Sequence, residues 1–189
     1  MEHQFEDQLF ENIDSSHKKF ANSGYDACTF SKCNFSNAHL SNNQYNDCIF
    51  TDCNLSMADL NQSTLNNVRF VNCKILGVKF NQCNSFIFEV AFDRCILDYC
   101  SFEKRKMSKT IFKDTSLKGT DFVDTDLKQS VFFNCDLDEA IFYNTNLQEV
   151  DFTTARNYII SPEENRIKKA RFSRDRLMGL LNKYNIVVE

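Results

Sequence analysis

Large apolar residues recur at every fifth position through most of this chain. The first run of these residues is Phe20, Tyr25, Phe30, Phe35, Leu40, Tyr45, Phe50, Leu55, Leu60, Leu65, Phe70, Ile75 and Phe80. After a shift of two residues the run continues with Ile87, Phe92, Leu97, Phe102, Met107, Phe112, Leu117, Phe122, Leu127, Phe132, Leu137, Phe142, Leu147 and Phe152. A helix repeats every 3.6 residues and a strand every two, so neither element alone explains a period of five. The chain is therefore built from a short internal repeat.

A longer period, four repeats in length, lies inside the short one. Every fourth large residue is a phenylalanine, in the series Phe30, Phe50, Phe70, Phe92, Phe112, Phe132 and Phe152. The residues two positions before the large ones are small and also sort into columns: one is Cys33, Cys53, Cys73, Cys95, Thr115 and Cys135, and a polar one is Ser23, Asn43, Ser63, Ser85, Arg105, Thr125 and Thr145. Residues four repeats apart must share an environment. This predicts coils with four short sides, stacked at the β-ladder spacing of about 4.8 Å.

All nine cysteines fall at the small positions of the repeat. Cysteines in such a chain serve as disulfides, as metal ligands or as small buried apolar residues. A stacked column points its thiols in parallel, whereas a metal site needs ligands that converge tetrahedrally. Disulfides are unexpected for an odd number of cysteines in a chain that lacks an export signal. We therefore interpret the cysteines as core residues, and expect no disulfide, no metal and no other cofactor.

Several segments resemble the pentapeptide-repeat protein family, among them CTFSKCNFSNAHL (28–40), CNLSMADL (53–60) and TDFVDTDL (120–127). The resemblance extends over about residues 20–152. The expected fold is accordingly all-β, a right-handed quadrilateral β-helix with a short C-terminal α-helix. The segment ARNYIISPEENRIKKARFS (155–173) resembles the C-terminal extension of the topoisomerase-protecting branch, which includes Qnr-type quinolone-resistance proteins and the albicidin- and microcin-immunity proteins.

Membership of that branch would imply a rod-like homodimer, joined through its C-terminal helices, that resembles duplex DNA in size and charge. Its partner would be DNA gyrase or topoisomerase IV, and its role would be to protect that enzyme from a poison. Qnr-type proteins often carry longer projecting loops. Here the only interruption of the repeat is the short segment NQCNSF (81–86), which favours the immunity-type function over the quinolone-specific one.

The sequence divides into three parts. We expect residues 1–19 to form an irregular N-terminal coil that caps the solenoid, because its small positions carry residues such as Gln8 and Lys18. Residues 20–155 form the repeat, with the two-residue slip at 81–87, and residues 156–189 form a C-terminal cap with a dimerisation helix. The chain starts without a signal peptide and lacks the roughly 20 apolar residues of a membrane span, so we expect it in the cytoplasm.

The C-terminal part carries two helix signals. Ser161-Pro162-Glu163-Glu164 has the pattern of a helix start, Ala170 and Phe172 restore one more repeat, and Ser173 is expected to cap a helix over 174–184. The apolar stripe of that second helix is Leu177, Leu180, Leu181 and Tyr184. It either covers the last coil alone or forms a two-fold dimer interface with Met178, Gly179, Ile186, Val187 and Val188. We favour the dimer, because one short helix cannot bury that much apolar surface alone.

Charge is distributed unevenly along the chain. Residues 1–155 carry 14 Lys and Arg against 22 Asp and Glu, a net charge of −8, whereas residues 156–189 carry 8 against 4, a net charge of +4. The acidic residues that we expect to face solvent and bind a partner are Asp114, Asp121, Asp124, Asp126, Asp136, Asp138 and Glu139. An acidic rod competes with nucleic acid for a basic groove. Ordinary solubilising surface has the same composition, so charge alone leaves both interpretations open.

Two local anomalies are further candidates for partner contacts. Phe86 and Phe88 flank Ile87, which the register places inward, so we expect at least one of the two rings to point outward. Arg105 stands where the repeat requires a small residue, within the basic segment 104–109. It indicates either a local distortion or a basic contact site.

No pattern typical of catalysis is present. The three histidines lie in the N-terminal quarter without a nearby nucleophile pattern, and no glycine-rich phosphate loop occurs. A filled four-sided rod also offers no concave pocket. We predict that the chain is not an enzyme. Two functions remain open: a DNA mimic that protects a topoisomerase, or a scaffold or regulatory module that binds an unrelated protein.

Overall fold

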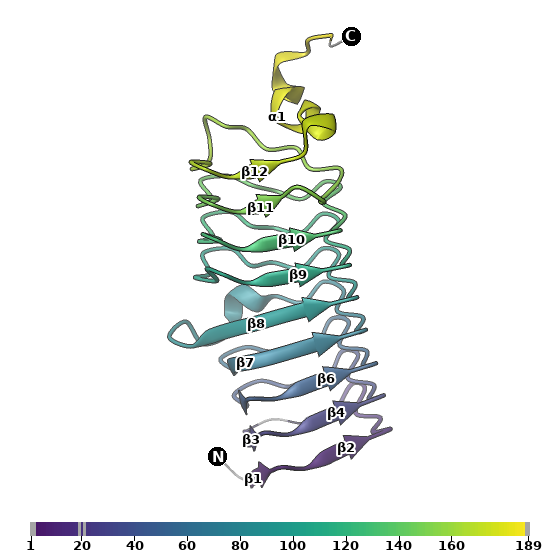
Figure 1. The fold of residues 1–189 in the computed structure, drawn as a ribbon. Coiled ribbons are helices and arrows are strands. Elements are labelled where there is room, and N and C mark those ends of the chain that lie inside the picture. Colours follow the sequence, from purple (N-terminus) through teal and green to yellow (C-terminus); the bar gives the residue numbers. More distant parts are fainter. Residues whose placement is uncertain (1–2, 19, 21, 188–189) are drawn as a thin grey trace.

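The chain forms a rod of stacked coils, with the two ends of the chain at opposite ends of the rod (Figure 1). The computed structural model describes residues 3–18, 20 and 22–187. The strands are β1 (His3–Glu6), β2 (Leu9–Glu11), β3 (Ser23–Asp26), β4 (Thr29–Ser31), β5 (Gln44–Asn46), β6 (Ile49–Thr51), β7 (Thr64–Val71), β8 (Phe88–Asp93), β9 (Ile111–Lys113), β10 (Val131–Phe133), β11 (Asp151–Phe152) and β12 (Arg171–Phe172). The helical segments are η1 (Phe80–Gln82), η2 (Arg174–Arg176), α1 (Met178–Leu181) and η3 (Asn182–Tyr184). None of the described helices combines the length and apolar character that crossing a membrane requires.

Each strand pairs in parallel with the strand one coil further along the chain. Phe30 in β4 pairs with Phe50 in β6, and Phe50 pairs with Phe70 in β7, so each coil consists of four repeats. Phe70 then pairs with Phe92 in β8, and the two-residue slip therefore falls between these two coils. This arrangement confirms the right-handed quadrilateral β-helix.

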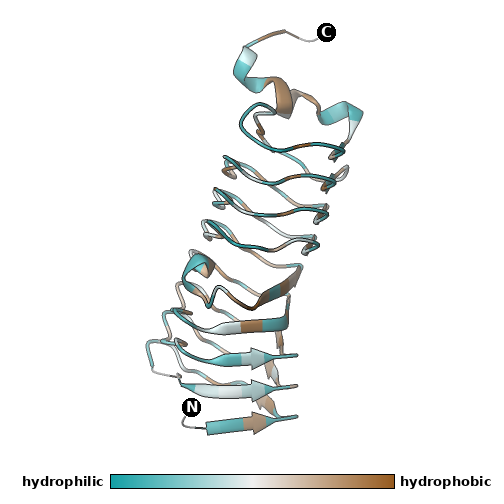
Figure 2. Ribbon diagram, turned by 90° about the vertical axis from the view of Figure 1, so that its left-hand side faces the viewer, coloured by the Kyte–Doolittle hydropathy of each residue, from teal (hydrophilic) through white to brown (hydrophobic). Residues whose placement is uncertain are grey.

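The phenylalanine column forms a continuous stack of rings inside the rod. The rings of Phe92 and Phe112 lie 5.4 Å apart, and those of Phe112 and Phe132 lie 4.7 Å apart, with interplanar angles of 9° in both cases. All three side chains are at most 1% exposed. Apolar and polar residues alternate along the ribbon, as Figure 2 shows by brown and teal. The large residues therefore fill the interior of the rod.

The polar column has a structural role that its burial alone would not suggest. Ser63 Oγ donates a hydrogen bond to Leu40 O at 2.7 Å, and Thr125 Oγ1 donates to Phe102 O at 2.9 Å. Thr145 Oγ1 likewise donates to Phe122 O at 2.8 Å. In each case the acceptor is a main-chain carbonyl of the preceding coil. The column is polar because these hydroxyls satisfy main-chain carbonyls that have turned toward the interior.

All nine cysteines are buried with free thiols, which confirms their interpretation as core residues. The Cys48 thiol donates to Tyr25 O in the preceding coil at 3.5 Å and to Asn46 O at 3.2 Å. Burial raises the pKa of Cys48, Cys83 and Cys135 to about 12. These three thiols therefore stay protonated at neutral pH in the folded protein.

The first coil keeps the register of the solenoid in its backbone. β1 pairs with β3 and β2 with β4, in the same one-coil register as the later strands. The rings of Phe5 and Phe10 stack on Tyr25 and Phe30 at 5.2 and 4.9 Å. Only the side chains depart from the repeat: Gln8 stands at a small position, and it is exposed instead of buried. That this coil acts as a cap remains a proposal.

The C-terminal end differs from the sequence interpretation at two points, Ser161 and Ser173. The predicted helix start at Ser161-Pro162-Glu163-Glu164 is wrong, because these residues form only a turn. The parallel ladder continues beyond that turn, and Phe172 pairs with Phe152 as expected. Residues 174–184 then form three short helical turns, η2, α1 and η3. Ser173 precedes them in an extended conformation and makes no side-chain capping hydrogen bond.

Candidate partner-binding surface

The repeat is interrupted between η1 and β8, where the chain projects from the side of the rod (Figure 1). Cys83 fills the buried small position there and is 4% exposed, whereas Ser85, which we had placed in that column, is exposed. The two extra residues are therefore accommodated after Cys83. Further along, Leu65 of β7 pairs with Phe88 of β8, and the register shifts again immediately afterwards.

Of the aromatic residues at the interruption, only Phe86 lies at the surface. Its side chain is 93% exposed. Phe88 is half-buried and packs edge-on against Phe80, with the ring centroids 6.0 Å apart, so it is the less accessible of the two predicted contact rings. The inward placement of Ile87 is also wrong, since Ile87 is 47% exposed. Phe88 takes the inward position because the extra residues shift the chain by one more position before β8 begins.

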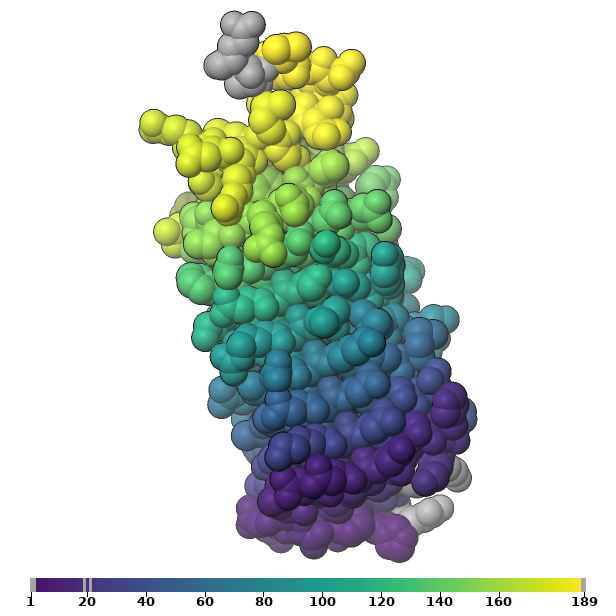
Figure 3. Space-filling view, turned by 90° about the vertical axis from the view of Figure 1, so that its right-hand side faces the viewer, coloured from purple at the N-terminus to yellow at the C-terminus, as the bar shows by residue number. Residues whose placement is uncertain are grey.

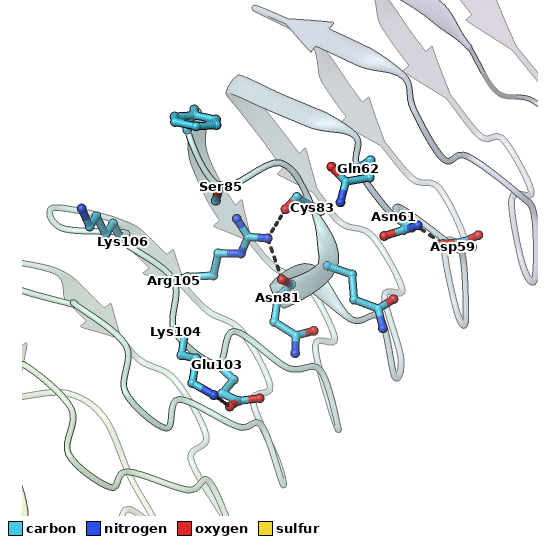
Figure 4. A pocket seen from close by; sticks show the side chains of 12 residues that line it. Asp59, Asn61, Gln62, Asn81, Cys83, Ser85, Glu103, Lys104, Arg105 and Lys106 are labelled. Atoms are coloured by element: carbon cyan, nitrogen blue, oxygen red, sulfur yellow. Dashed lines mark hydrogen bonds and ion pairs between the residues drawn. The ribbon is translucent and has the colours of Figure 1, made fainter.

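Arg105 is 5% exposed and bridges the gap that the projecting segment leaves. Its guanidinium donates to Asn81 O at 2.8 Å and to Cys83 O (Figure 4), and also to Asn84 O at 2.7 Å. It also lies over the Phe88 ring, 5.0 Å from the centroid. Ser63 and Thr125 donate side-chain hydrogen bonds to main-chain carbonyls of the preceding coil, and Arg105 does the same over a longer distance. This explains why the column accepts an arginine, and it makes Arg105 a structural residue instead of a basic contact.

Two grooves flank the interruption. The larger has a volume of about 960 Å³ and is lined in part by Asn81, Phe86 and Lys104. The smaller, of about 420 Å³, lies between Phe88 and Ile111. Lys106 lines both grooves and is exposed. Both grooves are open to solvent and have mixed polar and apolar linings, which is typical of contact surfaces and unlike an enclosed catalytic pocket.

The predicted acidic residues do not form one patch. Asp121, Asp126 and Asp136 belong to three separate parallel ladders, on different sides of the coil. Three of the predicted acidic residues accept a hydrogen bond from the amide of an asparagine one coil later, a pattern that the sequence analysis does not include. The pairs are Asn134–Asp114, Asn144–Asp124 and Asn146–Asp126. The signal was present in the sequence as Asp and Asn at equivalent positions of successive coils. This alternation avoids stacking like charges on adjacent coils.

Asp136 is the most enclosed of the predicted acidic residues and is 9% exposed. Lys118 Nζ and Arg156 Nη2 each lie 3.6 Å from its Oδ2, and Asn157 Nδ2 donates to Oδ1 at 2.8 Å. Burial alone would raise the pKa of Asp136, but the Asn157 hydrogen bond, the Asp138 N–H and the two cations outweigh it and lower the pKa. Asp136 is therefore a paired structural carboxylate and a poor candidate for partner binding.

Two of the predicted acidic residues keep free carboxylates. Asp138 and Glu139 are exposed and have no ion-pair partner among the described residues. Asp121 is half-buried, and its Oδ1 accepts a hydrogen bond from the Val123 N–H at 2.9 Å. The acidic surface available to a partner is thus much smaller than the charge count indicates.

The C-terminal helical turns cover the last coil and leave an apolar patch outside. Leu180 packs against the core. Gly179 also faces the solenoid, since its O accepts the Ile160 N–H at 2.9 Å and a Cβ at this glycine would lie 2.2 Å from Tyr158 O. Leu181 is half-buried. The side chains that remain exposed at this end are Ile159, Leu177, Met178, Tyr184, Ile186 and Val187. Val188 lies outside the described residues.

Solved structures similar to this chain share its fold. A trypsin-treated variant of QnrB1, a plasmid-mediated fluoroquinolone resistance protein, superposes with a TM-score of 0.75 at 18% identity, over 98% of this chain and 97% of that chain. HetL, a pentapeptide repeat protein involved in heterocyst differentiation regulation in the cyanobacterium Nostoc, gives a TM-score of 0.73 at 15% identity. The match covers 92% of this chain and 88% of that chain. At these identities the likeness shows the fold alone. No curated protein matches the sequence.

A protein-family comparison agrees with the repeat seen in the structure. The family described as pentapeptide repeat region matches residues 23–102 and 85–156, which together make up more than half of the chain. The matched residues are those whose large side chains fill the solenoid. The chain therefore belongs to the pentapeptide-repeat family.

Proposed function

We propose that the protein is a non-catalytic binding protein whose partner is DNA gyrase or topoisomerase IV, which it protects from a topoisomerase poison. The observation that carries this proposal is an acidic rod with the same fold as a fluoroquinolone resistance protein along nearly its whole length. Its sides are filled coils, and the side seen in Figure 3 has no deep hollow. A protein of this shape acts by presenting surface.

The free carboxylates Asp138 and Glu139 are the acidic contacts that we assign to this function. They lie outside the ion pairs and asparagine–aspartate hydrogen bonds that hold Asp114, Asp124, Asp126 and Asp136. Reversing their charge removes attraction to a basic groove without breaking a contact in the solenoid.

A supercoiling assay with purified gyrase and a quinolone or peptide poison tests the proposal. The wild-type protein is expected to inhibit gyrase or to restore supercoiling, and Asp138→Lys/Glu139→Lys is expected to require about tenfold more protein for the same effect. Glu6→Lys/Asp26→Lys is the matched control, because it makes the same charge change on exposed residues of the first two coils. A wild-type protein that neither inhibits nor rescues gyrase would contradict the proposal.

A scaffold or regulatory module with an unrelated partner is the second candidate, and the exposure of Phe86 favours it. An aromatic side chain that is 93% exposed beside an open groove is a typical contact anchor. Once a partner is known, binding that survives the double charge reversal but is lost in Phe86→Ala identifies this second function. Phe88 is unsuitable for the test, because its truncation would also damage the core.

We further propose that the protein is a homodimer joined at its C-terminal end. The patch of Leu177, Met178, Tyr184 and Ile186 is apolar, exposed and next to a groove of about 460 Å³. Sedimentation equilibrium is expected to give twice the mass of one chain for the wild type. The double variant Leu177→Glu/Met178→Glu is expected to give the mass of a single chain. A wild-type monomer at about 100 µM would refute the dimer.

A further inference from the structure

The backbone ladder of the solenoid is broken on one side, next to Lys106. In regular coils the residue before each large one donates its N–H to the preceding coil, as Asp126 N does to Arg105 O at 2.8 Å and Asp121 N to Cys100 O at 2.9 Å. In the described chain Lys106 N has no such bond. On this side the ladder runs from β3 through β5 to β7, and Asn84 N donates to Ser63 O at 2.9 Å. It then resumes only at the pair Lys106–Asp126.

The preceding coil has the matching unpaired edge. β8 pairs with β7 along its length, but with β9 only from Ala91 onward. Within the described residues, the backbone of Phe88–Val90 has no strand partner on the side of Lys106. The side chain of Arg105 holds the coils together across part of this gap. The gap is thus a slot between two coils, edged by the Lys106 N–H and by the backbone of Phe88–Val90. The nearby carbonyls of Asn81, Cys83 and Asn84 are already bonded to Arg105.

We propose that this slot binds an extended, acidic segment of a partner protein, which adds a strand beside Lys106. A strand supplies both acceptors and donors, as an unpaired β-edge requires, whereas a phosphate group would offer acceptors only. The inference deepens the proposed binding function and rests on it, since it gives the chemistry of the partner.

The charge beside the slot favours acidic side chains. Lys106 and Lys109 are exposed and have no ion-pair partner among the described residues, within a chain whose net charge is −4. Lys104, by contrast, is paired with Glu103. The smaller groove is lined by these two lysines and by one exposed carboxylate, Glu89, so its lining keeps a net positive charge that is complementary to carboxylates spaced along a strand.

The lining of the slot favours apolar residues between those carboxylates. Val68, Phe88 and Met107 line the smaller groove, and Phe86 lines the larger one. Successive side chains of a strand point to opposite faces. A segment in which acidic and apolar residues alternate would therefore place its carboxylates toward the lysines and its apolar residues against the groove.

A fluorescein-labelled peptide of four Glu-Val pairs is the probe, and fluorescence anisotropy is the readout. Saturable binding with a Kd below about 1 mM is expected for the wild-type protein, together with a shift of the Lys106 amide signal in nitrogen–proton NMR spectra. Lys106→Glu is expected to weaken binding roughly tenfold or more. Lys74→Glu is the matched control, because Lys74 is also exposed and also precedes a large inward residue, Ile75.

Two results would overturn the proposal. One is the absence of saturable binding below about 1 mM. The other is equal affinity for the same peptide methylated on alternate backbone nitrogens. This change removes every second N–H donor and keeps the charge, so equal affinity would indicate electrostatic attraction without strand addition. Neither measurement involves gyrase, so failure of the peptide test and failure of the gyrase test remain distinguishable.

Discussion

Replacing Phe92 by Ala is expected to lower the free energy of unfolding by about 3–5 kcal/mol. The ring is 1% exposed and is stacked between Phe70 at 5.3 Å and Phe112 at 5.4 Å. It also makes an edge contact with Phe102 at 6.0 Å. The parallel ladders on both sides fix the height of the coil, so the surrounding chain cannot collapse into the cavity. The full cost of the cavity is therefore expected.

Chemical denaturation followed by far-UV circular dichroism measures this loss. Phe133→Ala is the control, because Phe133 lies in the same column of strands but is 47% exposed, and it is expected to cost less than about 1 kcal/mol. A solenoid can unfold in parts, so amide exchange of the neighbouring coils should be measured as well. Equal denaturation midpoints for wild type and Phe92→Ala would mean that this column is not the core.

The regular part of the fold could be predicted from the sequence because each residue's position in the repeat decides its environment. Phe112 is buried for the same reason as Phe132, and no long-range information is needed to see it. The interruption differs. Both Ile87 and Phe88 are large apolar residues suited to the interior, so spacing could not decide between them, and only the pairing of Phe88 with Leu65 did.

The candidate site was predicted less well, because charge counts say nothing about partners. Asp114 and Asp136 are acidic in the sequence, but in the structure one accepts an asparagine amide and the other is held by two cations. Ser161-Pro162 has the composition of a helix start, yet the ladder to Phe172 keeps the chain in coils. In both cases a contact with the next coil outweighs the local signal.

Arg105→Thr is expected to destabilise the protein by about 3–5 kcal/mol, although the next coils carry threonine at the same column position. The guanidinium serves three carbonyls, those of Asn81, Cys83 and Asn84, and a threonine hydroxyl is too short to reach them across the gap. Hydrogen bonds from a charged donor contribute about 1.5–3 kcal/mol each, and water in the open grooves recovers part of the loss. Denaturation midpoints with unchanged slopes measure the effect.

The reason for the arginine can be tested by removing the interruption itself. A variant that lacks Ser85 and Phe86 restores five-residue spacing from Cys83 to Phe92, so the projecting segment no longer leaves a gap for a long side chain. In that background Arg105→Thr is expected to cost less than about 1 kcal/mol or to stabilise, because a threonine then fits the column as Thr125 and Thr145 do. The difference between the two backgrounds is the coupling between Arg105 and the interruption. An equal cost in both would show that Arg105 stabilises the coil independently of the slip, and that the slot beside Lys106 has another cause.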